Sequence, residues 1–131
     1  MNNYADRMLP TQPDAIAPDG CDVRVLLALQ GGSMAHFSLA PGQVSRAVVH
    51  RTVEEIWYVL SGEGEMWRRQ GEHESVLPLA AGCCLTIPLG TRFQFRAVGS
   101  EALTAVAITM PPWPGEGEAE IVTGGWVQAA G

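Results

Sequence analysis

Short runs of alternating apolar and polar residues fill the middle of the chain, and glycine and proline separate them. Such runs between turn-forming residues predict β-strands, and no window carries an apolar stripe at helical spacing over three turns. This pattern predicts an all-β sandwich or barrel. The expected strands are residues 23–29, 34–40, 47–53, 55–62, 65–69, 75–79, 84–88, 93–98 and 102–110.

The two ends of the chain differ from the middle. Pro10, Pro13 and Pro18 mark residues 1–22 as an N-terminal arm that cannot form a helix interior. Residues 23–111 are expected to form the barrel. Residues 112–131 are rich in proline and glycine but carry two tryptophans, so this tail is expected to pack on the barrel.

Composition excludes several classes of function. The net charge is −6 and all eight positive side chains are arginine, so no basic surface for nucleic acid is expected. No apolar run reaches the length of about 18 residues that a membrane span requires, and the N-terminus lacks the apolar core of a signal peptide. The three cysteines have neither disulfide-framework nor zinc-site spacing. A cytoplasmic protein with reduced, packed thiols is expected.

Candidate chemistry centres on a histidine and a glutamate five residues apart. Alternate residues of a strand share a face, so Arg46, Val48 and His50 are expected to point one way. Glu55 and Trp57 are expected to share a face of the next strand. If the two strands pair as a hairpin, His50 and Glu55 meet near its turn.

Three interpretations of this pair follow from the residues alone. A carboxylate that orients a neutral imidazole makes a workable general base. The same side chains can be half of a metal site. The third interpretation is a surface hairpin with a solvated His50 and Glu55.

The spacing around this pair resembles the first motif of the cupin superfamily, G(X)5HXH(X)3,4E(X)6G. Gly42 is followed by five residues and then by Val48 and His50, and four more residues lead to Glu55. Gly62 follows after six more. The stretch therefore looks like a cupin motif that has lost its first histidine.

A second stretch resembles the second cupin motif, G(X)5PXG(X)2H(X)3N. Gly82, Pro88 and Gly90 match it, and Phe93 stands at its histidine position. The resemblance covers roughly residues 23–111 and implies a small single-domain cupin, a double-stranded β-helix or jelly-roll barrel.

The resemblance also implies where a metal would bind. Metal-binding cupins use three histidines and one glutamate, and His50 and Glu55 match two of these positions. Val48 and Phe93 replace the other two and have no lone pair to donate. No cofactor is therefore favoured.

The alternative is a divalent metal (Mn, Fe, Ni or Zn) held by an unusual ligand set. His36 and Cys84 are the candidates to complete that set with His50 and Glu55, provided that their side chains face inward.

The favoured function is a metal-free pocket for a small polar ligand, either sugar-like or carboxylated. In this hypothesis His50 is a base or hydrogen-bond partner, Glu55 orients it, and Arg46 pairs with an anionic group. The expected apolar floor consists of Val48, Trp57, Phe93 and Phe95. Cupin-fold sugar-nucleotide epimerases similarly work without a metal, through a histidine and an acidic partner.

Two other functions remain open: a metal-dependent oxygenase or isomerase, and a non-catalytic module for ligand sensing or interaction. Whether the chain is an enzyme is left open, because one fold hosts many functions.

A homodimer is expected, with the N-terminal arm and the outward residues Ile56, Tyr58 and Leu60 packing on a second copy. In the alternative, the chain's own tail covers these three residues through Trp113 or Trp126.

Overall fold

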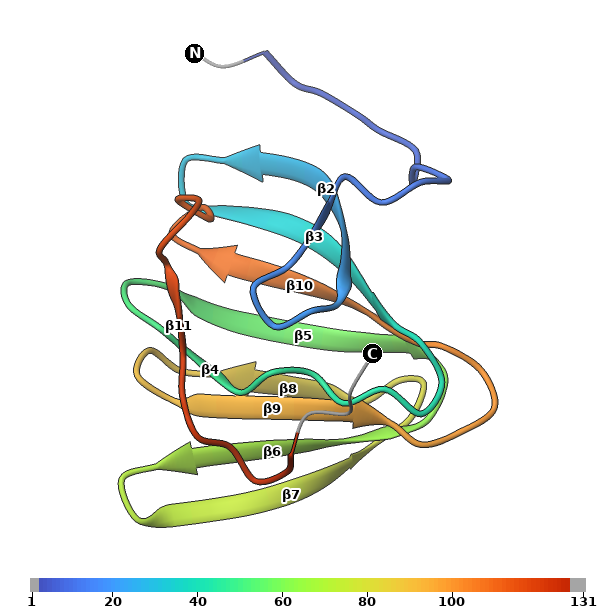
Figure 1. Ribbon diagram of the computed structural model, residues 1–131. Coiled ribbons are helices and arrows are strands. Elements are labelled where there is room, and N and C mark those ends of the chain that lie inside the picture. The colour runs from blue at the N-terminus through green and yellow to red at the C-terminus, as the bar shows by residue number, and fades with distance from the viewer. Residues whose placement is uncertain (1–2, 128–131) are drawn as a thin grey trace.

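Two antiparallel β-sheets face each other in the computed structural model, which describes residues 3–127 and has no helix among them (Figure 1). The first two residues of the arm and the last four of the tail lie outside this part. The six-stranded sheet has the order β1-β2-β3-β10-β5-β8 and the five-stranded sheet the order β11-β4-β9-β6-β7. The predicted all-β jelly roll is confirmed.

The strands agree closely with the pattern in the sequence. The nine expected strands are all present, with ends that differ from the prediction by at most three residues. The bounds in the six-stranded sheet are β1 Ala15–Ile16, β2 Asp22–Leu29, β3 Gly32–Leu39, β10 Leu103–Met110, β5 Glu54–Ser61 and β8 Cys84–Ile87. Those in the five-stranded sheet are β11 Ala119–Ile121, β4 Val48–His50, β9 Arg92–Ala97, β6 Gly64–Gln70 and β7 His73–Leu79. The short strands β1 and β11 were not predicted.

Strict alternation explains why β5 and β10 form the centre of their sheet. Every second residue of β5 from Glu55 to Val59 is buried, as is every second residue of β10 from Leu103 to Thr109. Directly paired residues share a face, so the inner residues of both strands meet those of the five-stranded sheet. The apolar core between the sheets includes Trp57, Val59, Met66, Ile87, Phe93 and Phe95.

The two site strands do not pair as a hairpin, which is the condition under which the sequence brings His50 and Glu55 together. β4 pairs with β9 and β11, whereas β5 pairs with β10 and β8, so these consecutive strands belong to opposite sheets. The chain bends at residues 51 and 52 and crosses from one sheet to the other. His50 therefore approaches Glu55 across the interior of the sandwich rather than along a hairpin.

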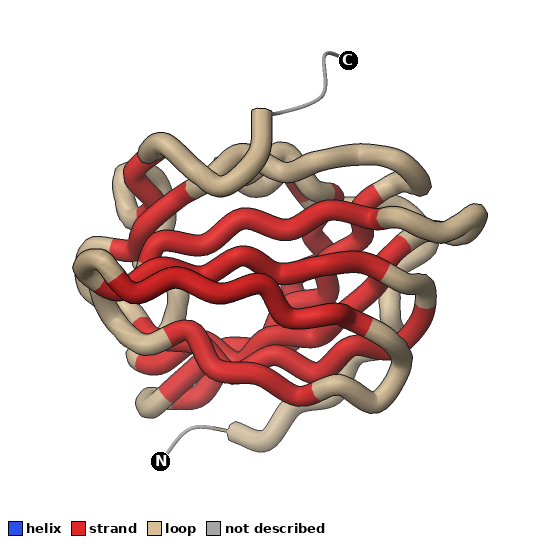
Figure 2. Tube along the Cα trace, turned by 90° about the horizontal axis from the view of Figure 1, so that it is seen from below, coloured by secondary structure: helices blue, strands red, loops and turns tan. Residues whose placement is uncertain are grey.

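The strands run across the molecule and the loops gather at its two ends (Figure 2). Among residues 3–127, no helix has the length and apolar character that crossing a membrane requires.

Candidate functional site

The carboxyl group of Glu55 lies inside the sandwich and accepts two hydrogen bonds. Thr109 pairs directly with Glu55 across β10 and β5, and its hydroxyl donates to Oε2 at 2.8 Å. Trp57, two residues along the same face, donates from Nε1 to Oε1 at 3.2 Å. Glu55 is only 4% exposed, so these two donors supply the hydrogen bonds that water supplies elsewhere.

His50 faces this carboxyl group from the opposite sheet. Its Nδ1 lies 3.7 Å from Oε1 of Glu55, which is longer than a hydrogen bond. Nδ1 is buried and has no hydrogen-bond partner among the described residues. The histidine is 7% exposed. Two hydrogen-bonding atoms thus face each other across a gap that neither of them bridges.

Aromatic rings enclose the imidazole. Phe93 of β9 and Trp113, which follows β10, each meet the His50 ring edge-on, with centroids 5.2 and 5.3 Å away. The backbone N–H of Trp113 donates to the Ser33 hydroxyl, which fixes this segment against β3. Trp57 packs against Phe93 from the side of Glu55. The site is therefore largely apolar, apart from the imidazole, the carboxyl group and the donors of that group.

Burial shifts both titrations toward the uncharged forms. Loss of solvation lowers the pKa of His50 to about 4, against a smaller opposing effect of the Glu118 carboxylate. Loss of solvation raises the pKa of Glu55 to about 7, and the bonds from Thr109 and Trp57 only partly offset this rise. The Asp19 carboxylate raises it further. Near neutral pH the imidazole is neutral, and Glu55 is close to the midpoint of its titration.

This arrangement supplies a proton donor and a proton acceptor side by side. Between about pH 4 and pH 7 a neutral His50 can accept a proton while a protonated Glu55 can give one. A pair of groups whose pKa values are driven in opposite directions is typical of acid–base sites.

The expected apolar floor lies around this pair. Val48, Trp57, Phe93 and Phe95 are all buried in the core, with exposures of 2% or less. Phe95 meets Trp57 edge-on at 5.1 Å. The alternation of β5 and β9 places these side chains inward, as the sequence predicts.

Arg46 does not share the inward face, so this expectation is wrong. Strand β4 begins only at Val48, and the irregular backbone before it breaks the alternation. Ala47 is buried and Arg46 is exposed, with its guanidinium donating to the Pro18 carbonyl.

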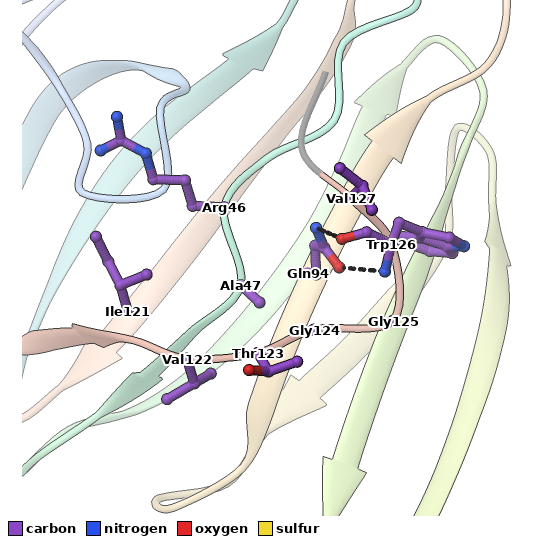
Figure 3. Close-up of a pocket in the computed structure, with 10 residues that line it drawn as sticks. All are labelled: Arg46, Ala47, Gln94, Ile121, Val122, Thr123, Gly124, Gly125, Trp126 and Val127. Atoms are coloured by element: carbon purple, nitrogen blue, oxygen red, sulfur yellow. Dashed lines mark hydrogen bonds between the residues drawn. The ribbon is translucent and has the colours of Figure 1, made fainter. Parts of the chain in front are cut away.

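Arg46 instead borders a hollow on the outer surface, with a volume of about 370 Å³, where the tail crosses the five-stranded sheet (Figure 3). Gln94 holds the tail there through two hydrogen bonds of 2.8 Å with the backbone of Trp126. The guanidinium of Arg96 lies over the Trp126 ring. Residues of the tail form part of the wall of this hollow, and neither His50 nor Glu55 lines it.

The two further residues proposed as metal ligands face away from the interior. His36 pairs with Val106 and Arg24, which lie on the outer face of the six-stranded sheet. Cys84 pairs with Tyr58 on the same face and is exposed. Neither can reach the pair inside, so the condition under which His36 and Cys84 were candidate ligands, an inward side chain, is not met. The expectation of packed thiols also fails for Cys84.

The donor set inside the sandwich does not suit a metal ion. Among residues 3–127, no group of three or more His, Cys, Asp or Glu side chains converges on one point. His50 and Glu55 offer two ligands, whereas protein metal sites usually supply at least three. The buried Val48 and Phe93 occupy the positions where the cupin resemblance implies histidines.

Two residues of the site were missed by the sequence analysis. The inward position of Thr109 follows from its parity with Ala105 and Ala107, so the signal was present. Trp113 follows two prolines in an irregular segment, and its place beside His50 has no periodic signal.

Comparison with solved structures shows similar folds at low sequence identity. The capsular polysaccharide assembling protein CapF from Staphylococcus aureus superposes with a TM-score of 0.70 at 14% identity, over 82% of this chain and 33% of CapF. The chain thus spans about a third of CapF. A recombinant oxalate oxidase in complex with glycolate gives 0.68 at 24% identity, over 83% and 60% of the two chains.

KdgF from Halomonas sp. gives a TM-score of 0.63 at 16% identity, over 75% of this chain and 85% of that one. Similarities at this level of identity establish the fold alone. A comparison with curated proteins finds no match.

The sequence pattern of the family described as "Cupin domain" matches residues 35–109, which is more than half of the chain and includes His50, Glu55 and Thr109. The chain belongs to the cupin family.

Proposed function

We propose that this cupin binds a small polar molecule inside its sandwich without a metal, and that His50 and Glu55 act on it as an acid–base pair. The observation that carries the proposal is the unbridged gap of 3.7 Å between Nδ1 of His50 and Oε1 of Glu55. A buried polar atom without a partner is costly, and a ligand that reaches it recovers that cost.

In the described part of the chain, no third His, Cys, Asp or Glu side chain converges with the pair, which supports a metal-independent site. Both oxygens of Glu55 already accept hydrogen bonds, from Trp57 and Thr109. These bonds hold the carboxyl group in one orientation toward His50. Edge-on packing of the Phe93 and Trp113 rings holds the imidazole in place. The pair is thus preorganised for a reaction or for binding.

Metal content tests the metal-independent part of this proposal. The protein is purified without chelator and without a nickel affinity step, and its metals are measured by plasma mass spectrometry. We expect less than about a tenth of an equivalent per chain, in wild type and in His50→Ala and Glu55→Ala alike. Near-stoichiometric metal in wild type that both folded variants lose would contradict the proposal and favour a metal-dependent enzyme.

A ligand screen tests the binding part. Small polar molecules are scanned for a rise in melting temperature, since a ligand that binds only the folded state stabilises it by about 2.7 kcal/mol at a hundredfold excess over Kd. We expect hits that disappear in folded His50→Ala. Hits that persist unchanged in His50→Ala and Glu55→Ala would place binding elsewhere.

We also propose that the partner of this chain is a second copy of itself, docked on the outer face of the six-stranded sheet. Met34, Ile56, Tyr58 and Leu60 project from this face with exposures of 37–48%. The chain's own tail leaves them uncovered as far as it is described, because Trp113 packs on His50 and Trp126 on Arg96.

The N-terminal arm supports this choice of partner. Its Tyr4 and Met8 side chains are 99% and 88% exposed, although Arg7 between them donates to the Val25 carbonyl of β2. Arg24 anchors the root of the arm at the edge of the same sheet, through the Pro10 and Thr11 carbonyls. One chain therefore carries two uncovered apolar surfaces, and an exchange of arms between two copies covers both.

Light scattering during gel filtration tests the dimer. We expect twice the chain mass of 14.0 kDa for wild type and a monomer for Tyr58→Glu. Val76→Glu, at an equally exposed position on β7, is the matched control and should remain dimeric. A monomeric wild type, or a Tyr58→Glu variant that stays dimeric, would contradict this partner.

A further inference from the structure

The interior of the sandwich contains acids but no fixed cation. Asp19, Glu55 and Glu118 are all buried, with exposures of 3–6%, whereas none of the eight arginines is buried and the chain has no lysine. Among residues 3–127, the buried side chains that can carry a positive charge are those of His36 and His50. Any negative charge placed beside Glu55 would therefore lack a counter-ion.

One half-buried arginine on the inner face of its strand is already bonded elsewhere. Arg68 pairs with Phe93 and so shares the inner face of β6. It is half-buried, and its Nη1 donates to the Thr86 carbonyl at 2.9 Å, at the edge between the sheets. Arg46 points outward, and its guanidinium lowers the pKa of the buried Asp19 carboxyl group, whereas loss of solvation dominates the pKa of both His50 and Glu55.

The polar atoms that face each other in the site, Nδ1 of His50 and Oε1 of Glu55, also restrict which hydrogen-bonding groups a ligand can present. Nδ1 of His50 has no partner, and burial keeps the imidazole neutral, so this atom can accept a hydrogen bond. Oε1 of Glu55 faces it and already accepts from Trp57. In the tautomer that carries its ring proton on Nε2, a group that contacts both atoms has to donate a hydrogen bond to Nδ1. A carboxylate or phosphate, which has only acceptors, cannot do so.

We infer that the ligand of this interior site presents a hydrogen-bond donor to Nδ1 of His50 and carries no negative charge. An alcohol and an amine meet both conditions. The inference rests on the proposed function and narrows its ligand class, because it favours a hydroxyl-bearing, sugar-like molecule over a carboxylated one. An anion would lie among buried carboxyl groups with no buried cation to compensate it, which is strongly unfavourable. An amine would pair with an ionised Glu55, while an alcohol binds whether or not Glu55 is ionised.

The test uses three probes of the same shape and four heavy atoms each: propan-2-ol, isopropylammonium and acetate. Each is titrated into the wild-type protein at neutral pH, and the nitrogen shifts of the histidine rings are followed by NMR. His36 is the internal control, because its Nδ1 is also buried without a partner but lies on the outer face. Folded His36→Gln and His73→Gln variants assign the three rings.

We expect the alcohol or the amine to shift the His50 ring while His36 stays unchanged, at least about tenfold more tightly than acetate, which corresponds to 1.4 kcal/mol. In folded Glu55→Gln the amine should lose its effect and the alcohol should keep it. Acetate binding at His50 as tightly as the other two would overturn the inference and leave the proposed function standing. No response of His50 to any probe would overturn the proposed function, and the inference with it.

Discussion

Two buried histidines lie on opposite sides of the six-stranded sheet, and they differ in what surrounds them. His36 and His50 are each 7% exposed, and Nδ1 of each has no hydrogen-bond partner in the described part of the chain. His36 lies on the outer face, paired with Arg24 on the neighbouring strand. His50 lies inside, 3.7 Å from the carboxyl group of Glu55.

The comparison shows that burial of an imidazole does not make it a functional site. Burial lowers the pKa of both rings, and the Arg24 guanidinium lowers the pKa of His36 further. A neutral ring beside a permanent cation has no group that can give it a proton. His50 faces a carboxyl group that holds its proton up to about pH 7, as the proposed acid–base pair requires.

The largest expected effect is on the free energy of unfolding, and it compares a residue that packs on His50 with a residue beside His36. Phe93→Ala should lower the free energy of unfolding by about 3–5 kcal/mol, because it removes a side chain that is 1% exposed and packs on both His50 and Trp57. Arg24→Ala, beside His36, should cost about 1 kcal/mol, because it removes two bonds to the arm. Denaturant unfolding measures both. Equal losses would contradict the view that the aromatic wall of His50 contributes more to stability than Arg24 does beside His36.

The next effect is a pH dependence of the unfolding free energy. In the wild type the contributions of His50 and Glu55 largely cancel. Between pH 6.5 and about 4 an unfolded chain protonates His50 whereas the folded chain does not, so His50 costs stability as pH falls. Between pH 4.5 and about 7 the unfolded chain ionises Glu55 whereas the folded chain does not, so Glu55 costs stability as pH rises. From pH 4.5 to 6.5 the two effects oppose each other.

Single substitutions separate these two contributions. Relative to wild type, the unfolding free energy of Glu55→Gln should rise with pH across this interval and that of His50→Gln should fall, each by on the order of 3 kcal/mol. Unfolding in denaturant at a series of pH values provides the measurement. Profiles of both variants that run parallel to the wild type would show that neither group is shifted.

A smaller effect should follow from removing one donor to the carboxyl group. Thr109→Val keeps the shape of the side chain but loses the 2.8 Å bond that stabilises the ionised form of Glu55. The pKa of Glu55 should rise above about 7, by about one further unit. Carbon NMR of the carboxyl group reports this change, and Thr104→Val, which bonds Ser61 on the outer face, is the matched control that should leave it unmoved.

The smallest effect is expected at the outer histidine. His36→Gln should leave the pKa of Glu55 at about 7, because the side chain lies on the far side of the sheet. The same titration measures it. A shift as large as that of Thr109→Val would mean that the two histidines belong to one electrostatic site.

Much of this arrangement follows from the sequence, because period-two alternation fixes the face of a residue once its strand is regular. Trp57 and Phe93 were placed inward correctly on that ground. The same rule, applied to Phe37 and Leu39 in β3, turns His36 outward, since the larger apolar residues of that strand face the core. Leu85 and Ile87 do the same for the outward Cys84, so the alternation already argues against both residues as inward ligands.

Other features depend on contacts between distant segments. The strand of His50 is only three residues long, so parity fails at Arg46, and the bend after it sends the chain to the opposite sheet. The meeting of His50 with Glu55 is therefore a consequence of how the sheets face each other, which local pattern does not specify. Trp113 reaches His50 through an irregular segment for the same reason.

The central claim is that His50 and Glu55 face each other as an uncharged base and acid, and their own titrations test it most directly. The protein is labelled in its histidine rings and glutamate carboxyl groups, and both resonances are followed by NMR from acid to mildly basic pH. The account predicts that His50 titrates at about 4 and Glu55 at about 7. A Glu55 that ionises at or below 4.5 beside a His50 that stays protonated above pH 6.5 would show an ordinary ion pair, and would contradict the account.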